Sequence, residues 1–463
     1  MKKVLVVDAG GRGNAIAYAF SKSKHVSEVY VAPGNAGSSL LEKCQQVPLK
    51  SISDILNFAR EKEIDLTFVG PEGYLSQGIV NVFQSAGLKI VGPTKEATVL
   101  ESSKCDTKDF LKTIGVPIAY YRNFDNPMDA KQFIIDFYEK NKGQNLVVKA
   151  DGLAAGKGSI VCNSKEEALY AVDKIMVEKI FGEAGNRVDI EQRLYGKELM
   201  FFALTDGRTI LPLEAAMDYK QAFDENDVEI IEWYNETIGN PNRRHNPNTG
   251  GMGGYSPHPW LDEELVDKIM ERIARPVITK FRELKGIEYK GIIYFGLMIC
   301  EENGEKNPYV LEINVRMGDP EAQVILPRLK TDFYEISMAI LEGTLHKIKL
   351  EWDPAYYLGI CAVSGRSYGT DGWREGYPGR HYTNRPIFGL RSVDKNCLIF
   401  HNGTSFRDPA KLDEDKNILT TGGRVLTLVA RGNSLQEARE IAYREIKKIF
   451  FNGMRYRRDI GKT

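Results

Sequence analysis

A short run of polar residues at the end of an apolar strand carries the most chemistry in this chain. Glu312 and Asn314 stand two apart within the run 311–315. In a β-strand they point to one face, while Leu311, Ile313 and Val315 enter the core. A carboxylate and an amide oxygen on one face suit magnesium, a hard cation that usually keeps nucleotide phosphates in its coordination shell. The run therefore predicts a magnesium–nucleotide site.

The polar residues that follow decide between this prediction and its alternative. For Glu312 and Asn314 alone, an edge strand with one solvated face is the better interpretation. Arg316, Asp319 and Glu321 come next in the chain. A solvated strand face does not need so many polar groups at one end, so the longer run favours a functional site.

Composition narrows the class of protein. A chain of 463 residues is long enough for about three domains. A net charge of −1 removes the usual argument for nucleic acid or an anionic membrane surface as a partner, and no apolar stretch is long enough to span a bilayer. The six cysteines are scattered without a Cys-x-x-Cys pair. They indicate reduced thiols of a cytoplasmic protein.

The first ninety residues alternate short β-rich and helical segments, which predicts a parallel α/β sheet. Among the helical segments, residues 75–86 are expected to form one helix. The glycine-rich loop 10–13 opens the first helix, whose N-terminus is a natural anion site. A dinucleotide fingerprint fits poorly, because the glycine spacing differs and no acidic residue ends the second strand. Arg12 suggests one bound phosphate, and a tight turn is the alternative.

A second glycine-rich loop lies between two β-rich runs, at residues 146–162. Its small side chains allow close approach to phosphates, and Lys149 and Lys157 supply positive charge. The spacing is not that of a Walker loop, because Gly158 follows Lys157 and the flanks indicate a hairpin. The alternative is a flexible hairpin turn without a ligand.

Three later segments complete the pattern. Residues 188–198 indicate strand, connector and strand, and such a connector could bind an adenine through its backbone while Glu198 takes the ribose hydroxyls. The loop 247–254 holds four glycines, which suits backbone contact with a ligand or a long surface turn. Ser434 and Glu437 form a capping box before an amphipathic helix, which we interpret as a core element.

Taken in this order, the segments resemble the glycinamide ribonucleotide synthetase family of the ATP-grasp superfamily. The matching stretches are residues 10–12, 32–37, 69–72, 103–104, 148–158, 247–253, 318–321, 400–401 and 403–404. The Pro-Asn-Thr-Gly-Gly-Met-Gly stretch at 247–253 is far more specific than the grasp pattern. The resemblance implies ATP-driven amide formation between glycine and 5-phosphoribosylamine in purine synthesis, with magnesium or manganese.

The resemblance also implies an α/β and α+β multidomain fold. An N-terminal parallel α/β domain is expected at residues 1–103 and an ATP-grasp domain at 104–336. The small lobe of that domain is expected at about 118–190, and a C-terminal α+β domain at 337–463. The expected protein is a cytoplasmic monomer or homodimer.

Residue roles follow from the matching positions. Metal binding is expected at Glu312 and Asn314. ATP binding is expected at Lys104, Lys149, Gly156, Lys157, Gly158, Glu191, Leu194 and Glu198. Substrate binding is expected at Gly11, Arg12, Asn35, Gly37, Glu72, Asp218, Gly250, Gly251 and Arg316. Catalytic roles are expected at Lys149, Lys220, Arg316 and Asp319.

The implied chemistry begins with activation of a carboxylate. Glycine must become glycyl phosphate before a free amine can displace phosphate, and phosphoryl transfer needs positioning and charge neutralisation. Arg316 could hold the acyl phosphate or the glycine carboxylate. Asp319 and Glu321 could bind glycine's ammonium or orient Arg316, or they are helix N-terminal charges. His401 could support the site, but a lone histidine there is more often structural.

The sequence departs from the family pattern at several points. Gly13-Asn14 replaces Glu-His, Gly73-Tyr74 replaces Ala-Pro, and Tyr219 replaces His. The acidic stretch 221–246 and the passage 366–376 are longer than typical, which we interpret as surface insertions. Two other functions compete. One is that of another ATP-grasp ligase or carboxylase acting on a related phosphoribosyl substrate, which should lack the 247–253 loop. The other is an ATP-binding sensor with an inactive site.

Overall fold

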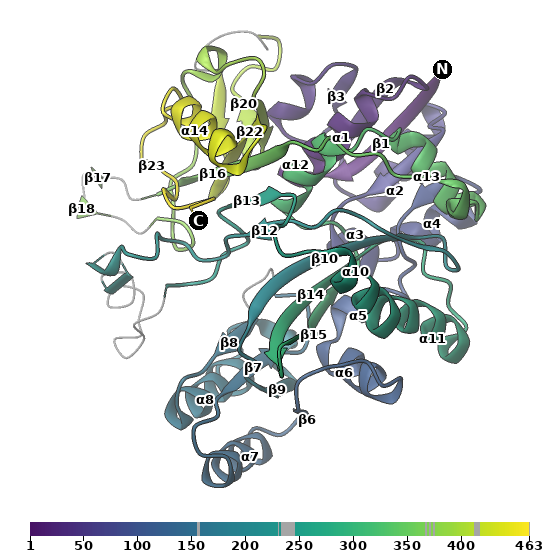
Figure 1. Cartoon of the computed structure of the whole chain (residues 1–463). Helices are drawn as coiled ribbons and strands as arrows, with labels where there is room; N and C mark the ends of the chain where they lie inside the picture. Colours follow the sequence, from purple (N-terminus) through teal and green to yellow (C-terminus); the bar gives the residue numbers. More distant parts are fainter. Residues whose placement is uncertain are drawn as a thin grey trace.

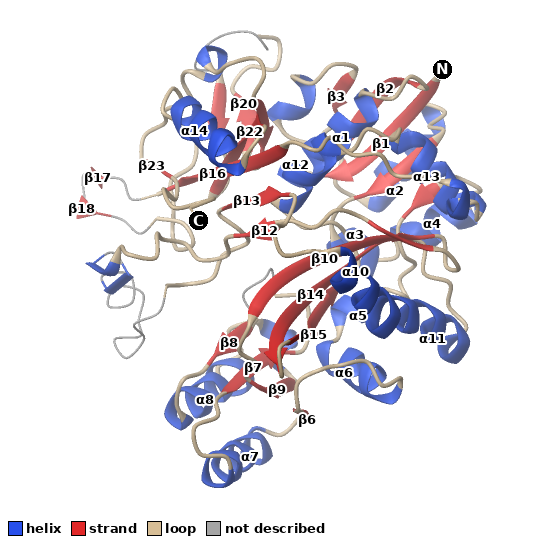
Figure 2. Ribbon diagram, viewed as in Figure 1, coloured by secondary structure: helices blue, strands red, loops and turns tan. Residues whose placement is uncertain are grey.

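The computed structural model describes residues 1–154, 158–229, 231–232, 246–365, 368–369, 372–373, 376–411 and 417–462. Its N-terminal part is a five-stranded sheet in the order β3-β2-β1-β4-β5, in which every pair is parallel. The strands are β1 Lys2–Asp8, β2 Val26–Pro33, β3 Cys44–Gln46, β4 Leu66–Val69 and β5 Ile90–Val91. The predicted parallel α/β class is confirmed (Figure 2).

Alternate side chains of β1 pack into two different hydrophobic clusters. Val4 and Val6 join the cluster that contains Phe20 of α1 Gly11–Ser21, whereas Leu5 and Val7 join the cluster that contains Ile55 of α2 Ile52–Glu61. Both faces of the sheet are therefore buried, which explains the continuous apolar run in the sequence. The other α-helices of this N-terminal part are α3 Glu72–Ser76, α4 Ile79–Ser85 and α5 Val99–Ser102.

The central part of the chain builds two antiparallel sheets (Figure 1). The larger has the order β11-β10-β14-β15, with β10 Lys197–Thr205, β11 Ile210–Pro212, β14 Gly291–Glu302 and β15 Glu305–Asn314. The smaller has the order β6-β9-β7-β8, with β6 Tyr121–Phe124, β7 Leu146–Ala150, β8 Ser159–Val161 and β9 Val188–Gln192. The predicted hairpin at the second glycine-rich loop is the β7–β8 pair.

Helices accompany both central sheets. The smaller sheet packs with α7 Pro127–Lys140 and α8 Lys165–Val172, whose apolar residues share one cluster with β7 and β9. The other central helices are α6 Lys104–Thr113, α10 Glu263–Ile269 and α11 Arg275–Lys285. None of the helices in the described part of the chain is long and apolar enough to cross a membrane.

The third sheet combines strands from distant parts of the sequence. Its order is β12-β13-β16-β22-β19, with β23 paired to β16. The strands are β12 Met217–Asp218, β13 Gly253–Ser256, β16 Tyr356–Ser364, β19 Leu398–His401, β22 Arg424–Gly432 and β23 Met454–Arg455. β12 and β13 come from the middle of the chain, so this sheet joins the central and C-terminal segments.

The remaining elements lie between and around these sheets. They include α12 Glu321–Ile325, α13 Phe333–Glu342, α14 Leu435–Ile446 and the short pairs β17 Tyr368–Gly369 with β18 Gly372–Trp373 and β20 Thr404–Phe406 with β21 Ile418–Thr420. The expected cap of α14 is present, since Ser434 Oγ accepts from the Glu437 amide at 3.1 Å. Ala438, Ala442 and Ile446 of this helix are fully buried, which confirms its core role.

Two local predictions are wrong. The helix expected over residues 75–86 is two helices, α3 and α4, because Gly78 between them adopts a left-handed conformation with φ of 85°. Leu311 does not enter the core. The register of β15 against β14 shifts at this point, with Gly296 opposite Glu312 but Leu297 opposite Val310. This bulge turns the half-buried Leu311 into a cleft.

Candidate active site

A cleft of about 640 Å³ lies where the N-terminal domain, both central sheets and the third sheet meet. Its volume is that of a small-molecule site. The predicted site residues that line it are Arg12, Glu72, Lys104, Lys149, Gly158, Glu191, Leu194, Glu198, Asp218, Lys220, Gly250, Glu312, Asn314, Arg316 and Asp319. Gly156 and Lys157 lie outside the described residues. Much of the acidic stretch 221–246 and of the passage 366–376 also lies outside them.

Four predicted substrate residues, Gly11, Asn35, Gly37 and Gly251, do not line the cleft. A side chain at Gly11 would clash with Gln323, one at Gly37 with Asn14, and one at Gly251 with Pro320. These glycines therefore permit close packing between segments. Asn35 is 4% exposed, and its amide donates to the carbonyl oxygens of Ala9 at 2.8 Å and His401 at 2.7 Å.

Asn14, one of the residues that depart from the family pattern, lies in the contact between Asn35 and His401. Asn14 Oδ1 accepts from the backbone amide of His401 at 3.0 Å, and its Nδ2 donates to Asn35 Oδ1 at 3.2 Å. His401 Nδ1 lies 2.9 Å from Thr404 Oγ1, and burial lowers its pKa to about 4. This neutral, buried histidine is a packing element, and Asn14 of α1 joins its backbone to Asn35.

Glu312 and Asn314 share the cleft-facing side of β15. Asn314 Nδ2 donates to Glu312 Oε1 at 3.3 Å, while Ile313 and Val315 are buried in the core. Burial alone would raise the pKa of Glu312, but Lys220, Lys104 and Lys149 lower it. An ionised carboxylate beside an amide group is a donor set that fits a hard divalent cation.

Arg316 is held by two glutamates. Its Nε donates to Glu72 Oε2 at 3.0 Å, and its Nη2 donates to Glu101 Oε1 at 3.0 Å and to Asn314 Oδ1 at 3.1 Å. Burial alone would lower the pKa of Arg316, but Glu101 and Glu72 raise it. Strand alternation predicted the proximity to Asn314. Glu101, in the short helix α5, has no signal in the sequence.

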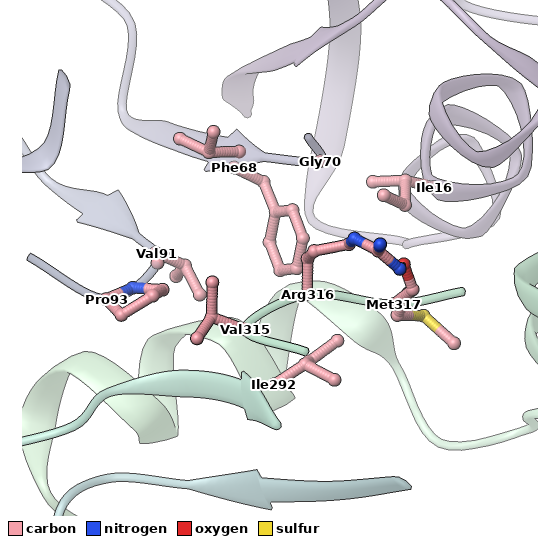
Figure 3. A pocket seen from close by; sticks show the side chains of 11 residues that line it. Ile16, Phe68, Gly70, Val91, Pro93, Ile292, Val315, Arg316 and Met317 are labelled. Atoms are coloured by element: carbon pink, nitrogen blue, oxygen red, sulfur yellow. The ribbon is translucent and has the colours of Figure 1, made fainter. Parts of the chain in front are cut away.

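A small cavity lies beside Arg316, between the N-terminal sheet and β14 (Figure 3). Its volume is about 10 Å³, enough for one water molecule at most. Ile16, Phe68, Ile292 and Val315 make its wall largely apolar. It is a packing seam, so a ligand near Arg316 must occupy the large cleft.

Asp319 lies at a junction of three segments. Its carboxylate lies close to Gly10, the N-cap of α1. Asp319 Oδ2 is 3.3 Å from the position that a Cβ would take if Gly10 carried a side chain. Asp319 Oδ1 accepts from Gln323 Nε2 at 2.7 Å and pairs with Arg424 Nη1 at 3.3 Å. Arg424 also donates to the backbone oxygens of Asp319 at 2.7 Å and Gly250 at 2.8 Å. Sequence reasoning missed Arg424, which follows a glycine pair at the start of β22.

The side of the cleft at β12 is acidic. Burial and the nearby Glu321 raise the pKa of Asp218 well above its usual range, and Asp218 Oδ1 has no hydrogen-bond partner among the described residues. The Nζ atom of Lys220 lies 3.5 Å from Glu198 Oε2. Burial would lower the pKa of Lys220, but Tyr294 and Glu198 raise it well above its usual range. The site thus has a charged lysine and a half-buried carboxyl group whose Oδ1 has no hydrogen-bond partner among the described residues.

The lysines of the opposite wall come from α6 and β7. Lys104 Nζ donates to the carbonyl of Gly152 at 3.0 Å, and Lys149 Nζ pairs with Glu191 Oε1 at 2.5 Å. The connector from Arg193 to Gly196 borders the same region. Lysines, a glycine-rich hairpin and an exposed connector backbone form a surface that suits a nucleotide.

The comparisons with known proteins agree along the whole chain. Residues 2–101 match the phosphoribosylglycinamide synthetase N domain, residues 102–322 its ATP-grasp (A) domain and residues 373–463 its C domain. The phosphoribosylamine–glycine ligase of Archaeoglobus fulgidus is 50% identical, with 99% of each chain covered. That of Caldanaerobacter subterraneus subsp. tengcongensis is 41% identical, again with 99% of each covered.

Solved structures give the same result. The crystal structure of phosphoribosylamine–glycine ligase from Thermotoga maritima matches with a TM-score of 0.77 at 28% identity, covering 99% of this chain and 100% of that one. A biotin carboxylase domain from Hydrogenobacter thermophilus, in complex with MgADP, ADP and bicarbonate, has a TM-score of 0.67 at 15% identity over 98% of this chain and 91% of that one, which indicates a shared fold. The resemblance deduced from the motifs is confirmed, and the chain belongs to the phosphoribosylglycinamide synthetase family of ATP-grasp ligases.

Proposed function

We propose that the chain joins glycine to 5-phosphoribosylamine, with ATP cleaved to ADP and phosphate, in purine nucleotide synthesis. The observation that carries the proposal is that one cleft combines the Glu312–Asn314 donor pair, the lysines of α6 and β7, and Arg316. The names of the full-length relatives support the choice of substrates. A carboxylase is the weaker candidate, because the biotin carboxylases match in fold at low identity.

The nucleotide occupies the part of the cleft between the two central sheets. Lys104 and Lys149 neutralise its phosphates, together with Lys157, and Gly156 and Gly158 allow close approach of the loop. The backbone near Leu194 binds the adenine, and Glu198 binds the ribose. Glu312 and Asn314 would hold the divalent cation, which when bound offsets negative charge on the phosphate oxygens. The cation is magnesium or manganese, because carboxylate and amide oxygens suit both.

The two other substrates lie toward the N-terminal domain and β12. A carboxylate oxygen of glycine attacks the γ-phosphorus, and ADP leaves; the amine of phosphoribosylamine then attacks the acyl carbon, and phosphate leaves. Arg12 binds the ribosyl phosphate. The unpaired Asp218, with Glu321, lies where it can bind an amine, and Lys220 and Arg316 offset charge on the transferred phosphoryl group.

We divide the chain into domains at residues 1–103, 104–336 and 337–463. The N-terminal parallel sheet ends at Val91, and the matched N and ATP-grasp domains meet at residues 101 and 102, which supports the first boundary. The pairing of β13 with β16 makes the second boundary a shared sheet. We also propose a cytoplasmic enzyme, a monomer or a homodimer, consistent with its six free cysteines.

The proposal is tested by following oxygen from glycine. Glycine labelled with heavy oxygen in its carboxylate passes one label into inorganic phosphate, because that oxygen leaves with the γ-phosphoryl group. Mass spectrometry of the phosphate measures this transfer while the amide product accumulates. Omission of glycine or of phosphoribosylamine is the control, and each omission stops steady ADP formation. Unlabelled phosphate, or robust turnover with bicarbonate in place of glycine, rules out the proposed reaction.

Arg12→Ala raises the KM for phosphoribosylamine about tenfold, as expected for loss of a hydrogen bond to a charged group. The KM values for glycine and ATP stay unchanged in steady-state kinetics. The melting temperature falls as well, because Arg12 Nε pairs with the buried Asp8 Oδ2 at 2.8 Å.

A second variant separates binding from stability. Arg12→Ala with Asp8→Asn removes the unpaired buried charge, so the melting temperature recovers while the raised KM remains. A KM for phosphoribosylamine equal to that of the unmodified enzyme would show that Arg12 only supports the loop.

A further inference from the structure

Four buried ionisable side chains meet beside the nucleotide half of the cleft. Lys108 comes from α6, Lys149 from β7, and Asp189 and Glu191 from β9. Their exposed fractions are 3%, 6%, 0% and 2%. Burial of so many ionisable groups is costly unless they pair with one another, so their arrangement needs a specific reason.

The Glu191 carboxylate lies between the two ammonium groups. Lys108 Nζ is 3.0 Å from Glu191 Oε2, and Lys149 Nζ is 2.5 Å from Glu191 Oε1. Each lysine also donates to β15: Lys108 to the carbonyl of Val310 at 3.1 Å, and Lys149 to that of Leu311 at 2.9 Å. Lys108 and Lys149 thereby connect Glu191 of β9 to β15, the strand that carries Glu312.

The bulge in β15 accounts for this pair of contacts. Successive carbonyls of a regular strand point to opposite edges. Leu311 is the extra residue at the register shift and has no partner on β14. The disrupted ladder lets two consecutive carbonyls accept from lysines on the same side.

The charges of the cluster follow from burial and proximity. Burial would raise the pKa of Glu191, but Lys108 and then Lys149 lower it to about 2. Burial and Glu191 raise the pKa of Asp189 well above its usual range. Both lysines contact Glu191, so this is the carboxylate that they neutralise.

Lys149 cannot serve two anions equally. It lines the cleft together with Lys104 and Lys108, and the proposed function assigns Lys149 to the nucleotide phosphates. A lysine that turns toward a phosphate weakens its pairing with Glu191, and an unpaired buried carboxylate is strongly unfavourable. Lys108 remains on the other carboxylate oxygen, fixed by the Val310 carbonyl.

We propose that Lys108 is a positioning residue of the nucleotide site, which keeps Glu191 paired and in place while Lys149 contacts the nucleotide. This inference rests on the proposed role of Lys149. Lys108 holds the smaller central sheet against β15 through Glu191 and Val310. The adenine-binding connector that follows β9 therefore keeps its position relative to Glu312 and Asn314.

The test is a double-mutant cycle on the full-length enzyme. Lys108→Met raises the KM for ATP and the dissociation constant of ADP about tenfold, since one partner of a buried charged pair is removed. In the Glu191→Gln background the same substitution changes both constants less than about twofold, because no charge is left to neutralise. Steady-state kinetics gives the KM, and titration calorimetry gives the dissociation constant.

Two variants complete the design. Lys112→Met makes the same change on the same helix at an exposed position and leaves both constants unchanged. If Lys108→Met does not fold, Lys108→Gln replaces it, since a neutral donor to Val310 remains while the charge is lost. The KM for glycine stays constant in every variant, which a general loss of structure would not allow.

The outcomes separate this inference from the proposed function. Equal effects of Lys108→Met in the unmodified enzyme and in the Glu191→Gln background, or no effect in either, overturn the positioning role. That result leaves the glycine-dependent ATP turnover of the unmodified enzyme intact. Loss of the glycine dependence itself would instead overturn the proposed function.

Discussion

Glu312→Gln lowers kcat about 100-fold, the size of effect expected when one preorganised electrostatic group is removed from a site of charge transfer. The substitution keeps the shape of the side chain and its contact with Asn314 Nδ2, but it removes the charge that a divalent cation requires. Steady-state ADP formation at saturating magnesium measures the effect.

The fold tolerates this change. Glu312 faces Lys220, Lys104 and Lys149 across an open cleft, so no buried partner loses its only contact, and the melting temperature changes little. Glu305→Gln, on the same strand but exposed, is the matched control and keeps normal turnover. Near-normal kcat in Glu312→Gln would show that this carboxylate is not a metal ligand.

Arg316→Met abolishes measurable turnover and also destabilises the fold. The substitution leaves Glu72 and Glu101 without the guanidinium that bridges them at 3.0 Å each. Breaking a buried pair in this way costs about 3 kcal/mol. Denaturant unfolding measures the loss in free energy, and coupled ADP assays measure activity.

A double variant separates the two roles of this arginine. Adding Glu101→Gln to Arg316→Met removes the more buried of the two unpaired charges, because the Glu101 side chain is 8% exposed and that of Glu72 is 26% exposed. The unfolding free energy then recovers in large part, while turnover stays absent. Recovery of turnover along with stability would mean that Arg316 acts only as a structural bridge.

Local pattern alone determined several features of this protein. The alternation of β-rich and helical segments predicted the parallel N-terminal sheet, and the two-residue spacing of Glu312 and Asn314 predicted their shared face on β15. The cap at Ser434 predicted the start of α14. Such features depend on backbone periodicity and on hydrogen bonds within a few residues, so a short stretch of sequence contains all the information they need.

Tertiary structure decided how these pieces combine into a site. Arg316 meets Glu72, 244 residues away, and Glu101, 215 residues away. Arg424 at the start of β22 meets Asp319 beyond the end of β15, Lys108 meets Glu191, and Asn35 donates to the carbonyl of His401. The bulge turned Leu311 outward against its local pattern. These contacts arise from the packing of elements that are distant in the sequence. A buried charge pairs with whichever group that packing brings within reach. The spacing of residues along the chain therefore could not predict these contacts.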